Sequence, residues 1–583
     1  MAPGRGTGEG RADRWFRAGL VLVVALYVAH ALRLGFRSDD AYITYRYVAN
    51  FLAGEGMVYN PGERVEGNTN VLWALLLAGL EAVVPGRELP LIARVLGIAT
   101  GAATLVLVAF LGRSLGPPGG LRPLLAPALL AADTSFCAWS SSGLETPLFA
   151  LLVLAGGASY ARHLQGRGSL LWTPVLFALA SLTRPEGPLL FAATTAFELA
   201  RRFIGRRPLA DWSLAAWFGL FALLWVPYQA WRISYYGWLL PNTFYAKVGS
   251  GVEQWWRGLA YLDRFADRHA AFAFPFALAL YARWQRGLAY LGRFADRFDA
   301  FAFSSALKLL ARRRVEPWAA YLLLLVAAYA GFIVAVGGDG LLLFRFCVHV
   351  APLAYLLVQE GAASLARGAR RVLPRALHAL PALAGWAFAG LALYQTAYQT
   401  RAVLVTPERW YEPQCELSFP GNGEDHDHLF FGDYFVERLT VAARWLETNA
   451  PPGSLVASTP AGAIAYNMGH PVIDMLGLND EHIAHVDVEG MGGGRAGHEK
   501  GDGAYVLSRR PDYVLLGNVA VLPRPILLGE FEGKLVRRSE HELWFHPEFR
   551  RDYELVHVRL ADEGLFQVFS FFRRKATAPP REE

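Results

Sequence analysis

The sequence predicts a polytopic α-helical membrane protein that continues into a soluble α/β domain at its C-terminal end. More than half of its 583 residues are hydrophobic, and the mean hydropathy is +0.25, which soluble domains of this length seldom reach. Apolar segments recur from residue 16 to residue 398. Beyond residue 398 the composition changes, because nine of the fourteen His residues lie there. We therefore expect a membrane domain followed by a soluble one.

Apolar segments of roughly 20 residues are typical of membrane helices, and we predict about eleven of them. The first, from Phe16 to Leu34, is too long for a signal-peptide core and lacks a small-residue cleavage site, so we interpret it as an uncleaved span. Residues 70–85 are also apolar, but we place them in the outer leaflet, because a span there would invert every later segment. The predicted spans lie near residues 16–36, 90–112, 121–138, 146–163, 169–184, 186–201, 212–233, 268–283, 317–337, 342–362 and 377–398.

The arginines predict the orientation of this membrane domain. With the spans alternating as above, the arginine-rich loops all fall on the side of the N-terminus, which the positive-inside rule assigns to the cytoplasm. We therefore expect a multi-pass protein of a bacterial inner (cytoplasmic) membrane, with the C-terminal domain on the periplasmic side. The arginines lie at residues 5–17, 113–122, 162–167, 201–207, 312–314 and 367–375.

We predict two domains, a membrane domain at residues 1–399 with its first outer loop at 37–89, and an α/β domain at residues 400–583. In the second, strand-like runs such as SLVAS and DYVLLG alternate with helical runs such as FVERLTVAARWLETN. Residues 257–274 recur at 286–303 with three differences in eighteen positions, which indicates one local duplication. The arginine pattern requires that only one copy crosses the membrane, and we favour the first copy.

Composition also excludes some classes of partner and site. Only five of the 56 basic residues are Lys, and no basic run resembles a nucleic-acid-binding arm, so we expect no nucleic acid. The three cysteines lie far apart, which rules out a disulfide framework and a cysteine-based metal site.

Two adjacent carboxylates, Asp39 and Asp40, begin the first outer loop. One interpretation is a helix N-cap, in which Ser38 or Asp39 starts a helix over residues 41–52. The other is a functional site, because ionisable groups at membrane depth are energetically expensive and other charged residues also gather at the outer ends of spans. A general base beside cationic clamps for an anionic leaving group would have this composition. The other charged residues are Glu145, Arg184, Glu186, Asp339 and Arg345.

Several stretches, in the same order along most of the chain, resemble one family. The chain resembles the GT-C membrane glycosyltransferases, and within them the bacterial branch that contains the mycobacterial terminal β-(1→2)-arabinofuranosyltransferase. It departs from that branch in its duplication and in the run between Asp339 and Arg345. The stretches are SDDAYITYRYVANFLAGEGMVYNPGERVEGNTNVLWALLL, SGLETPLFALL, LTRPEG, LPNTFYAKVG, GGDG with FRF, and IDMLGLND with GHEKGDGAYVLSRRPDYVLLG.

The resemblance implies an inverting transfer of a sugar from a polyprenyl-phosphate donor to a glycan acceptor, on the outer face of the membrane. It implies that an acidic residue of the first outer loop is the catalytic base. We favour Asp39 in that role, with Asp40 orienting the acceptor or a bound cation. An arabinofuranosyl unit is the sugar that the branch suggests.

The remaining candidate residues fall into two groups. Donor and phosphate binding are assigned to Arg184, Lys247 and Arg345, with Asn242 and Tyr245 at the sugar. The alternative for the arginines is snorkelling to lipid headgroups, and for Lys247 a solvated loop. Acceptor or pocket roles are assigned to Tyr42, Arg46, Glu66, Glu145 and Asp339.

The sequence indicates no particular cofactor and leaves a metal requirement open, and a divalent cation could be held by the GEDHDH stretch at residues 423–428. For that stretch we favour a solvated polar loop. His482 and His485 are interpreted as local structure, and the glycine run at 490–497 lacks the strand–turn–helix setting of a nucleotide loop.

Two alternative functions stay open. The same fold could glycosylate a protein or lipid A, and a lipid or glycan transporter would be a different class. A transporter predicts repeated halves and polar groups at the bilayer midplane, whereas here the polar groups gather at one leaflet. The expected partners are the polyprenyl-phosphate-linked sugar, the glycan acceptor and the lipid bilayer.

Overall fold

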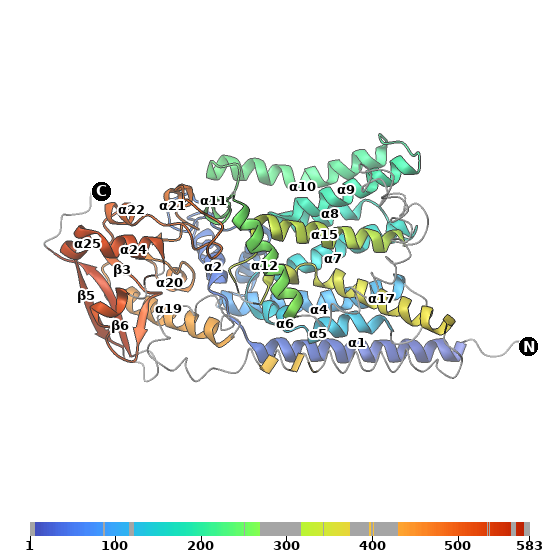
Figure 1. Ribbon diagram of the computed structural model, residues 1–583, viewed down its shortest axis with the longest axis horizontal. Helices are drawn as coiled ribbons and strands as arrows, with labels where there is room; N and C mark the ends of the chain where they lie inside the picture. Colours follow the sequence, from blue (N-terminus) through green and yellow to red (C-terminus); the bar gives the residue numbers. More distant parts are fainter. Residues whose placement is uncertain are drawn as a thin grey trace, which may run out of the picture.

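The computed structural model describes residues 6–85, 88–115, 122–249, 251–268, 316–341, 343–372, 394, 396–397, 400–401, 429–532, 535, 537–560 and 567–576. A bundle of long helices forms one part of the molecule, and the C-terminal domain covers one end of it (Figure 1). The N-terminus lies at the opposite end of the bundle. The predicted fold class, a helical membrane domain followed by an α/β domain, is confirmed.

Four of the described helices are long and apolar enough to cross a membrane, and a fifth span is counted if the bent pair of α6 and α7 is taken as one. The predicted number of eleven is therefore not established by the described residues. The four long helices are α1 (Gly6–Leu34), α4 (Leu89–Leu115), α10 (Trp212–Tyr236) and α15 (Pro317–Val336). Around them lie η1 (Arg122–Leu124), α5 (Leu125–Ala132), α6 (Thr134–Ser141), α7 (Thr146–Leu164), α8 (Trp172–Thr183), α9 (Gly187–Ile204), α16 (Arg345–Val348) and α17 (Ala351–Val372).

The segment 121–138, predicted as one span, is instead broken at Asp133. The carboxylate of Asp133 accepts hydrogen bonds from the backbone N–H groups of Ser135 and Phe136, and so caps α6. A side-chain cap of this kind starts a new helix and ends the previous one. Helices α6 and α7 then meet at an angle of 118°. The predicted span at 121–138 is thus a set of short elements, whereas the segment predicted at 146–163 is the single helix α7.

The first outer loop supplies two helices at the end of the bundle that faces the C-terminal domain. Helix α2 (Asp39–Leu52) packs on α3 (Val71–Val83). With 13 residues, α3 is shorter than the roughly 20 residues that a straight membrane helix needs, which agrees with the placement of 70–85 outside the set of spans.

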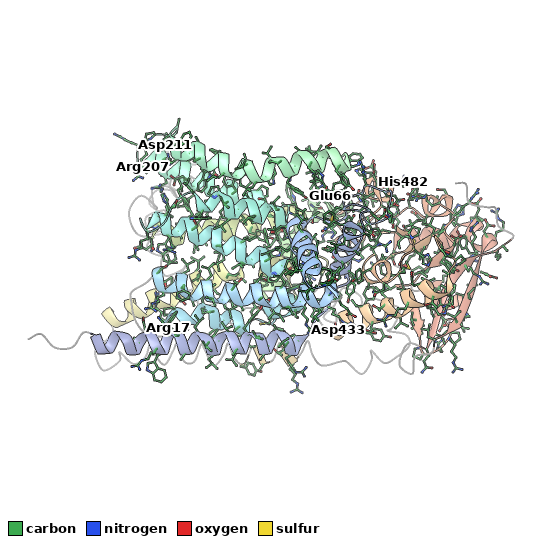
Figure 2. All side chains as sticks on the ribbon, turned by 180° about the vertical axis from the view of Figure 1, so that it is seen from behind. Arg17, Glu66, Arg207, Asp211, Asp433 and His482 are labelled. Carbon is green, nitrogen blue, oxygen red and sulfur yellow. The ribbon has the colours of Figure 1, made fainter. Side chains whose placement is uncertain are left out.

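Two arginines of the predicted cytoplasmic loops, Arg17 and Arg207, lie at the bundle end remote from the C-terminal domain. Figure 2 shows Arg17, Arg207 and Asp211 at that end, whereas Glu66 and His482 lie at the other. At the remote end, Arg113 and Asp13 form an ion pair at 2.5 Å. The bundle therefore has a basic end and an end covered by the domain.

In the part that the structure describes, the C-terminal domain is built on a six-stranded sheet. Strands β2, β1 and β3 are parallel, and β6 runs antiparallel to β3, β4 and β5. The strands are β1 (Val456–Ser458), β2 (Val472–Asp474), β3 (Tyr513–Leu515), β4 (Ala520–Leu522), β5 (Tyr553–Arg559) and β6 (Val568–Arg574). The helices are α19 (Leu429–Asn449), α20 (Ala463–Tyr466), α21 (Glu481–His485), α22 (Gly503–Ser508), α23 (Leu528–Glu532), α24 (Arg538–Phe545) and α25 (Pro547–Asp552).

The domain and the outer loop share a continuous apolar core, with α20 packed on α2. Within this junction the buried guanidinium of Arg46 donates to the carbonyls of Ala465, Met468 and His470 at 2.6–3.1 Å. A buried charge with several hydrogen bonds is strongly held. The C-terminal domain and the first outer loop are therefore firmly attached to each other.

Two more helices, α11 (Asn242–Lys247) and α12 (Val252–Arg268), follow α10 near the domain. The predicted span at 268–283, the second copy of the duplication, the GEDHDH stretch and most of the predicted span at 377–398 lie outside the described residues.

Candidate active site

A cavity of about 470 Å³ lies where the first outer loop, the ends of the bundle helices and the C-terminal domain meet. Six basic and five acidic side chains line it, together with apolar side chains such as Trp139 and Phe346. Many ionisable groups around one cavity are typical of a functional site. The charged residues are Arg37, Asp39, Asp40, Glu145, Arg184, Glu186, Lys247, Asp339, Arg345, Arg495 and Arg537.

Asp39 is held by the C-terminal domain. Its Oδ1 accepts a hydrogen bond from the N–H of Ala463 at 2.7 Å, and its Oδ2 accepts one from Gly462 at 3.3 Å. Burial, together with the charge of Asp40, raises the pKa of Asp39 to about 7, although the two N–H groups oppose that shift. Asp39 lies in the first turn of α2 rather than capping it, and Ser38 makes no side-chain cap.

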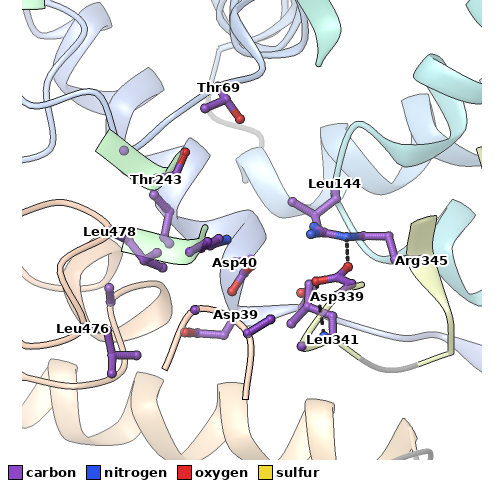
Figure 3. Close-up of a pocket in the computed structure, with 18 of the residues that line it drawn as sticks. Asp39, Asp40, Thr69, Leu144, Thr243, Asp339, Leu341, Arg345, Leu476 and Leu478 are labelled. Atoms are coloured by element: carbon purple, nitrogen blue, oxygen red, sulfur yellow. Dashed lines mark hydrogen bonds and ion pairs between the residues drawn. The ribbon is translucent and has the colours of Figure 1, made fainter. Parts of the chain in front are cut away.

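Asp40, the next residue, is open to the cavity. Its carboxylate has no hydrogen-bond partner among the described residues. Its negative charge interacts electrostatically with Arg345 and Arg495. Figure 3 shows Asp39 extending toward the loop of the C-terminal domain, while Asp40 points into the space shared with the Asp339–Arg345 pair. The two neighbouring carboxylates therefore have different surroundings.

Arg184 lies in a buried network at the ends of α7 and α8. Its Nε donates to Glu186 at 2.5 Å, and its Nη1 pairs with Glu145. Glu145 also accepts a hydrogen bond from the side chain of Asn70 at 2.9 Å, which connects the network to the first outer loop. Two carboxylates thus fix one guanidinium at the cavity wall.

Arg345 forms the second fixed cation, at the start of α16. Its Nε donates to Asp339 at 2.6 Å, and only 6% of the residue is exposed. The two preceding residues, Leu343 and Phe344, have φ values of +53° and +50°, and the carbonyl of Leu343 accepts a hydrogen bond from Trp139. Such backbone conformations are costly for side chains of this size, so the surrounding structure must hold this turn in place.

Lys247 ends α11 and lines the same cavity. Its ammonium group has no hydrogen-bond or ion-pair partner among the residues that the structure describes. Its charge acts on Asp339 and His498, which places it near both. Lys247 is therefore a cation that can meet a ligand without first breaking an ion pair.

The C-terminal domain contributes two basic residues that the sequence analysis missed, Arg495 and Arg537. The side chain of Arg495 donates to the carbonyl of Gly340 at 3.0 Å, across the cavity from its own domain. Burial and the neighbouring charge of Arg537 lower the pKa of Arg495 to about 10. The one available signal was the position of Arg495 between a glycine run and the GHEK stretch that carries the resemblance.

Among the other predicted residues, Glu145 and Asp339 line the cavity, whereas five do not. The side chain of Asn242 donates to the carbonyls of Gly477, Leu478 and Asp480, and so fastens α11 to the C-terminal domain. Tyr245 packs against His485, with ring centroids 4.3 Å apart.

The remaining three stabilise the first outer loop. Tyr42 packs edge-on against Tyr45 and Tyr466. Arg46 makes the junction contacts described above, and Glu66 pairs with Arg232 at 2.8 Å. These positions show no direct access to the cavity.

A metal site receives no support from the described part of the chain. No group of three or more His, Cys, Asp or Glu residues there could hold a metal ion. His482 pairs with Asp502, and His485 stacks on Trp238, so both make the local contacts that the sequence analysis favoured.

A curated terminal β-(1→2)-arabinofuranosyltransferase of Mycobacterium tuberculosis is 33% identical over 245 residues, which are 40% of this chain and 38% of that protein. Two fifths of this chain are similar to a glycosyltransferase. The enzyme of the same name from Corynebacterium glutamicum is 32% identical over 257 residues, or 39% of this chain and 35% of its own. The chain thus spans less than two fifths of the length of the curated relatives it matches. The resemblance predicted from the sequence is confirmed over that region.

Residues 433–576 match a family described as a domain of unknown function (DUF8728). Among solved structures, the chain is similar to ArnT from Cupriavidus metallidurans bound to undecaprenyl phosphate, with 11% identity and a TM-score of 0.44 over 79% of this chain and 86% of that one. It is also similar to the Archaeoglobus fulgidus oligosaccharyltransferase, with 12% identity and a TM-score of 0.42 over 77% of this chain and 62% of that one.

Proposed function

We propose that this protein is an inverting glycosyltransferase that moves a sugar from a polyprenyl-phosphate donor to a glycan acceptor. The observation that carries the proposal is that two carboxylates and three basic side chains line the same cavity. They are Asp39, Asp40, Arg184, Arg345 and Lys247. A general base and cations for a departing phosphate are the two needs of this reaction. The similarity to terminal β-(1→2)-arabinofuranosyltransferases supports an arabinofuranosyl unit as the sugar.

In the proposed reaction the base removes a proton from a hydroxyl of the acceptor. The hydroxyl oxygen attacks the anomeric carbon from the face opposite the lipid phosphate. The bond between that carbon and the phosphate oxygen breaks, and its electron pair leaves with the phosphate. One displacement inverts the anomeric configuration.

Asp40 is the carboxylate that we assign as base. Both of its oxygens are without partners among the described residues, whereas each oxygen of Asp39 already accepts a backbone hydrogen bond. A base must have a lone pair within hydrogen-bond reach of the proton that it abstracts. Asp39 then acts as a positioning residue that fixes the start of α2 against the C-terminal domain. This moves the role of base from Asp39, which we favoured from the sequence, to Asp40.

The three cationic side chains also differ in whether they already have a partner. Lys247 can meet the phosphate directly, while Arg345 and Arg184 are already paired with carboxylates. A phosphate entering beside Arg345 would share that guanidinium with Asp339. Because the leaving phosphate carries its own negative charge, cations stabilise it better than a proton donor would.

The topology is proposed together with the reaction. We place the cavity and residues 400–583 on the outer, periplasmic face of the inner membrane, and residues 1–399 in the membrane domain. The support is the position of Arg17 and Arg207 at the bundle end away from the domain.

The decisive experiment uses full-length protein in lipid nanodiscs, a short-chain polyprenyl phosphate that carries radiolabelled arabinofuranose, and an arabinofuranosyl disaccharide. We expect a labelled trisaccharide whose new linkage has the configuration opposite to that of the donor. Retention of configuration, or movement of the lipid without a new glycosidic bond, would contradict the proposal; the second result would favour a transporter.

A further inference from the structure

A second, open hollow of about 640 Å³ lies beside the cavity, and none of the catalytic roles above uses it. Its walls come from the first outer loop, the segment before α11 and the C-terminal domain around α21 and α22. We call it the aromatic groove and define it by Glu63, Trp238, His482, His485, Tyr505 and Arg509.

The rings of the aromatic groove are held in place by one another. Trp238 stacks on His485 with centroids 4.2 Å apart, and His482 stacks on Tyr505 with centroids 4.0 Å apart. Trp238 nevertheless remains 38% exposed. Preassembled rings that keep a free surface in water can receive an apolar ligand face at a small entropic cost.

Polar groups lie among these rings. Arg509 donates to the hydroxyl of Tyr505 at 2.7 Å and pairs with Glu63 at 3.2 Å. The exposed carboxylate of Glu481 has no partner among the described residues and also lines the groove. With three acidic and two basic side chains in its lining, the groove is close to neutral.

This combination selects one chemical class of ligand. A nucleic acid or a phosphate group would require an excess of basic residues, which the lining lacks. A purely apolar ligand would cover the carboxylate of Glu481 without giving it a hydrogen-bond partner. A sugar ring has apolar C–H faces and hydroxyl edges, so it can stack on Trp238 while its hydroxyls bond to the charged side chains.

The groove lies next to the proposed active site. Three segments of the chain each contribute one residue to the groove and, two positions away, one residue to the cavity. The pairs, with the groove residue first, are Val65 and Gly67, Trp238 and Leu240, and Asp480 and Leu478. Two residues of extended chain span at most about 7 Å, so the hollows are neighbours.

Asn242 fastens these segments to one another. Its backbone N–H donates to the carbonyl of Glu66, and its side chain donates to the carbonyls of Leu478 and Asp480. The relative position of groove and cavity is therefore fixed by hydrogen bonds.

We infer that the aromatic groove binds a neutral oligosaccharide, namely the part of the acceptor chain that lies several sugars away from the reacting end. The inference rests on the proposed function for the identity of the acceptor, whereas the binding itself does not depend on transfer. A long acceptor would lie across Trp238 and place its terminal sugar in the cavity beside Asp40. A disaccharide would occupy the cavity alone.

The test compares an arabinofuranosyl hexasaccharide with the disaccharide, using full-length protein in nanodiscs. In Trp238→Ala, the kcat/KM for the hexasaccharide should fall relative to that for the disaccharide by about five- to tenfold, the usual contribution of one aromatic contact. The change should lie in KM, and Trp238→Phe should restore most of it. The matched control is Trp212→Ala, because Trp212 is 86% exposed and lies beside Asp211 at the far end of the bundle.

Binding is measured separately in the Asp40→Asn variant by saturation-transfer NMR with the same hexasaccharide. Binding that needs Trp238 supports the inference even if no transfer occurs with any donor, in which case the proposed function alone fails. If transfer occurs and Trp238→Ala affects both acceptors equally, the groove inference is overturned and the proposed function stands. Absence of hexasaccharide binding to the otherwise unaltered groove also overturns it.

Discussion

Replacing Asp40 by Asn tests the proposed base with little disturbance of the fold. The substitution keeps the size of the side chain and removes its charge and its basicity. Since the carboxylate of Asp40 makes no hydrogen bond to the described residues, the substitution removes none of the hydrogen bonds that the structure describes. Loss of a general base typically slows a reaction by about 10²–10⁴-fold, or roughly 3–5 kcal/mol of transition-state stabilisation. We expect the rate to fall by that amount while the melting temperature stays the same.

Asp39→Asn is the matched variant, and its expected behaviour is different. Asp39 accepts backbone hydrogen bonds from Gly462 and Ala463. An amide can accept only one of these and turns an NH₂ group toward the other donor. Hydrogen bonds to charged groups contribute about 1.5–3 kcal/mol each, so this variant should melt at a lower temperature. Its loss of rate should be smaller than that of Asp40→Asn.

The assay is single-turnover transfer of radiolabelled arabinofuranose from the short-chain lipid phosphate, followed by separation of the trisaccharide. Differential scanning fluorimetry on the same samples reports folding. A near-wild-type rate in Asp40→Asn would refute its assignment as base. A larger loss in Asp39→Asn, with the melting temperature preserved, would return the role of base to Asp39.

The pH dependence of the rate follows from the raised pKa of Asp39. Burial and the charge of Asp40 raise that pKa to about 7, so Asp39 is protonated below pH 7 and ionised above it. Ionisation places a second negative charge beside Asp40, which favours movement of the acceptor proton toward this pair of carboxylates. We therefore expect kcat/KM to rise as the pH increases through about 7. In Asp39→Asn that rise should be absent, and an unchanged profile would contradict the coupling.

Three further variants test the cations, the junction and the topology. Arg345→Ala should weaken binding of a short-chain polyprenyl phosphate by about 10–100-fold, as expected for a charge-assisted hydrogen bond. Asp339→Asn, which frees the guanidinium of Arg345, should not weaken binding of the lipid phosphate. If Arg345→Ala binds the lipid phosphate as tightly as the unaltered protein does, Arg345 has only a structural role. Arg46→Met should leave three buried carbonyls without their donor and speed hydrogen exchange in the C-terminal segment that it contacts, whereas unchanged exchange would contradict this role. In a cysteine-free background, Glu489→Cys should react with an impermeant thiol reagent on intact cells and Arg207→Cys should not, and the reverse pattern would invert the topology.

The two-domain plan of the molecule could be predicted from the sequence because many residues contribute to each signal. The hydropathy of a long segment, or the composition of a whole domain, sums over all of its residues. Long apolar segments gave α1, α4, α10 and α15, and a change of composition gave the C-terminal domain. The break at Asp133 was missed, since a single capping carboxylate inside an apolar stretch has little effect on average hydropathy.

The site was predicted in part, for a physical reason. Charged residues at the ends of apolar segments are expensive to bury, and so Arg184, Arg345 and Asp339 could be selected one segment at a time. Arg495 and Arg537 carry no such signal, because arginines are common on a soluble domain. Their importance comes from the way in which the domain packs on the bundle, which the local sequence does not specify.

The adjacency of Asp39 and Asp40 explains why both carboxylates occur at the start of one helix. Successive residues of an α-helix point about 100° apart, because one turn contains 3.6 residues. Neighbouring side chains of α2 must therefore face different partners, and here one faces the C-terminal domain while the other faces the cavity. The hydrogen bonds of Asp39 fix the rotation of α2 about its axis, and that rotation decides where the carboxylate of Asp40 lies. A pair of adjacent carboxylates can thus couple attachment of the domain to the position of the base. On this argument, inserting one Ala between them should abolish transfer, because Asp39 and Asp40 could then no longer face the C-terminal domain and the cavity at the same time.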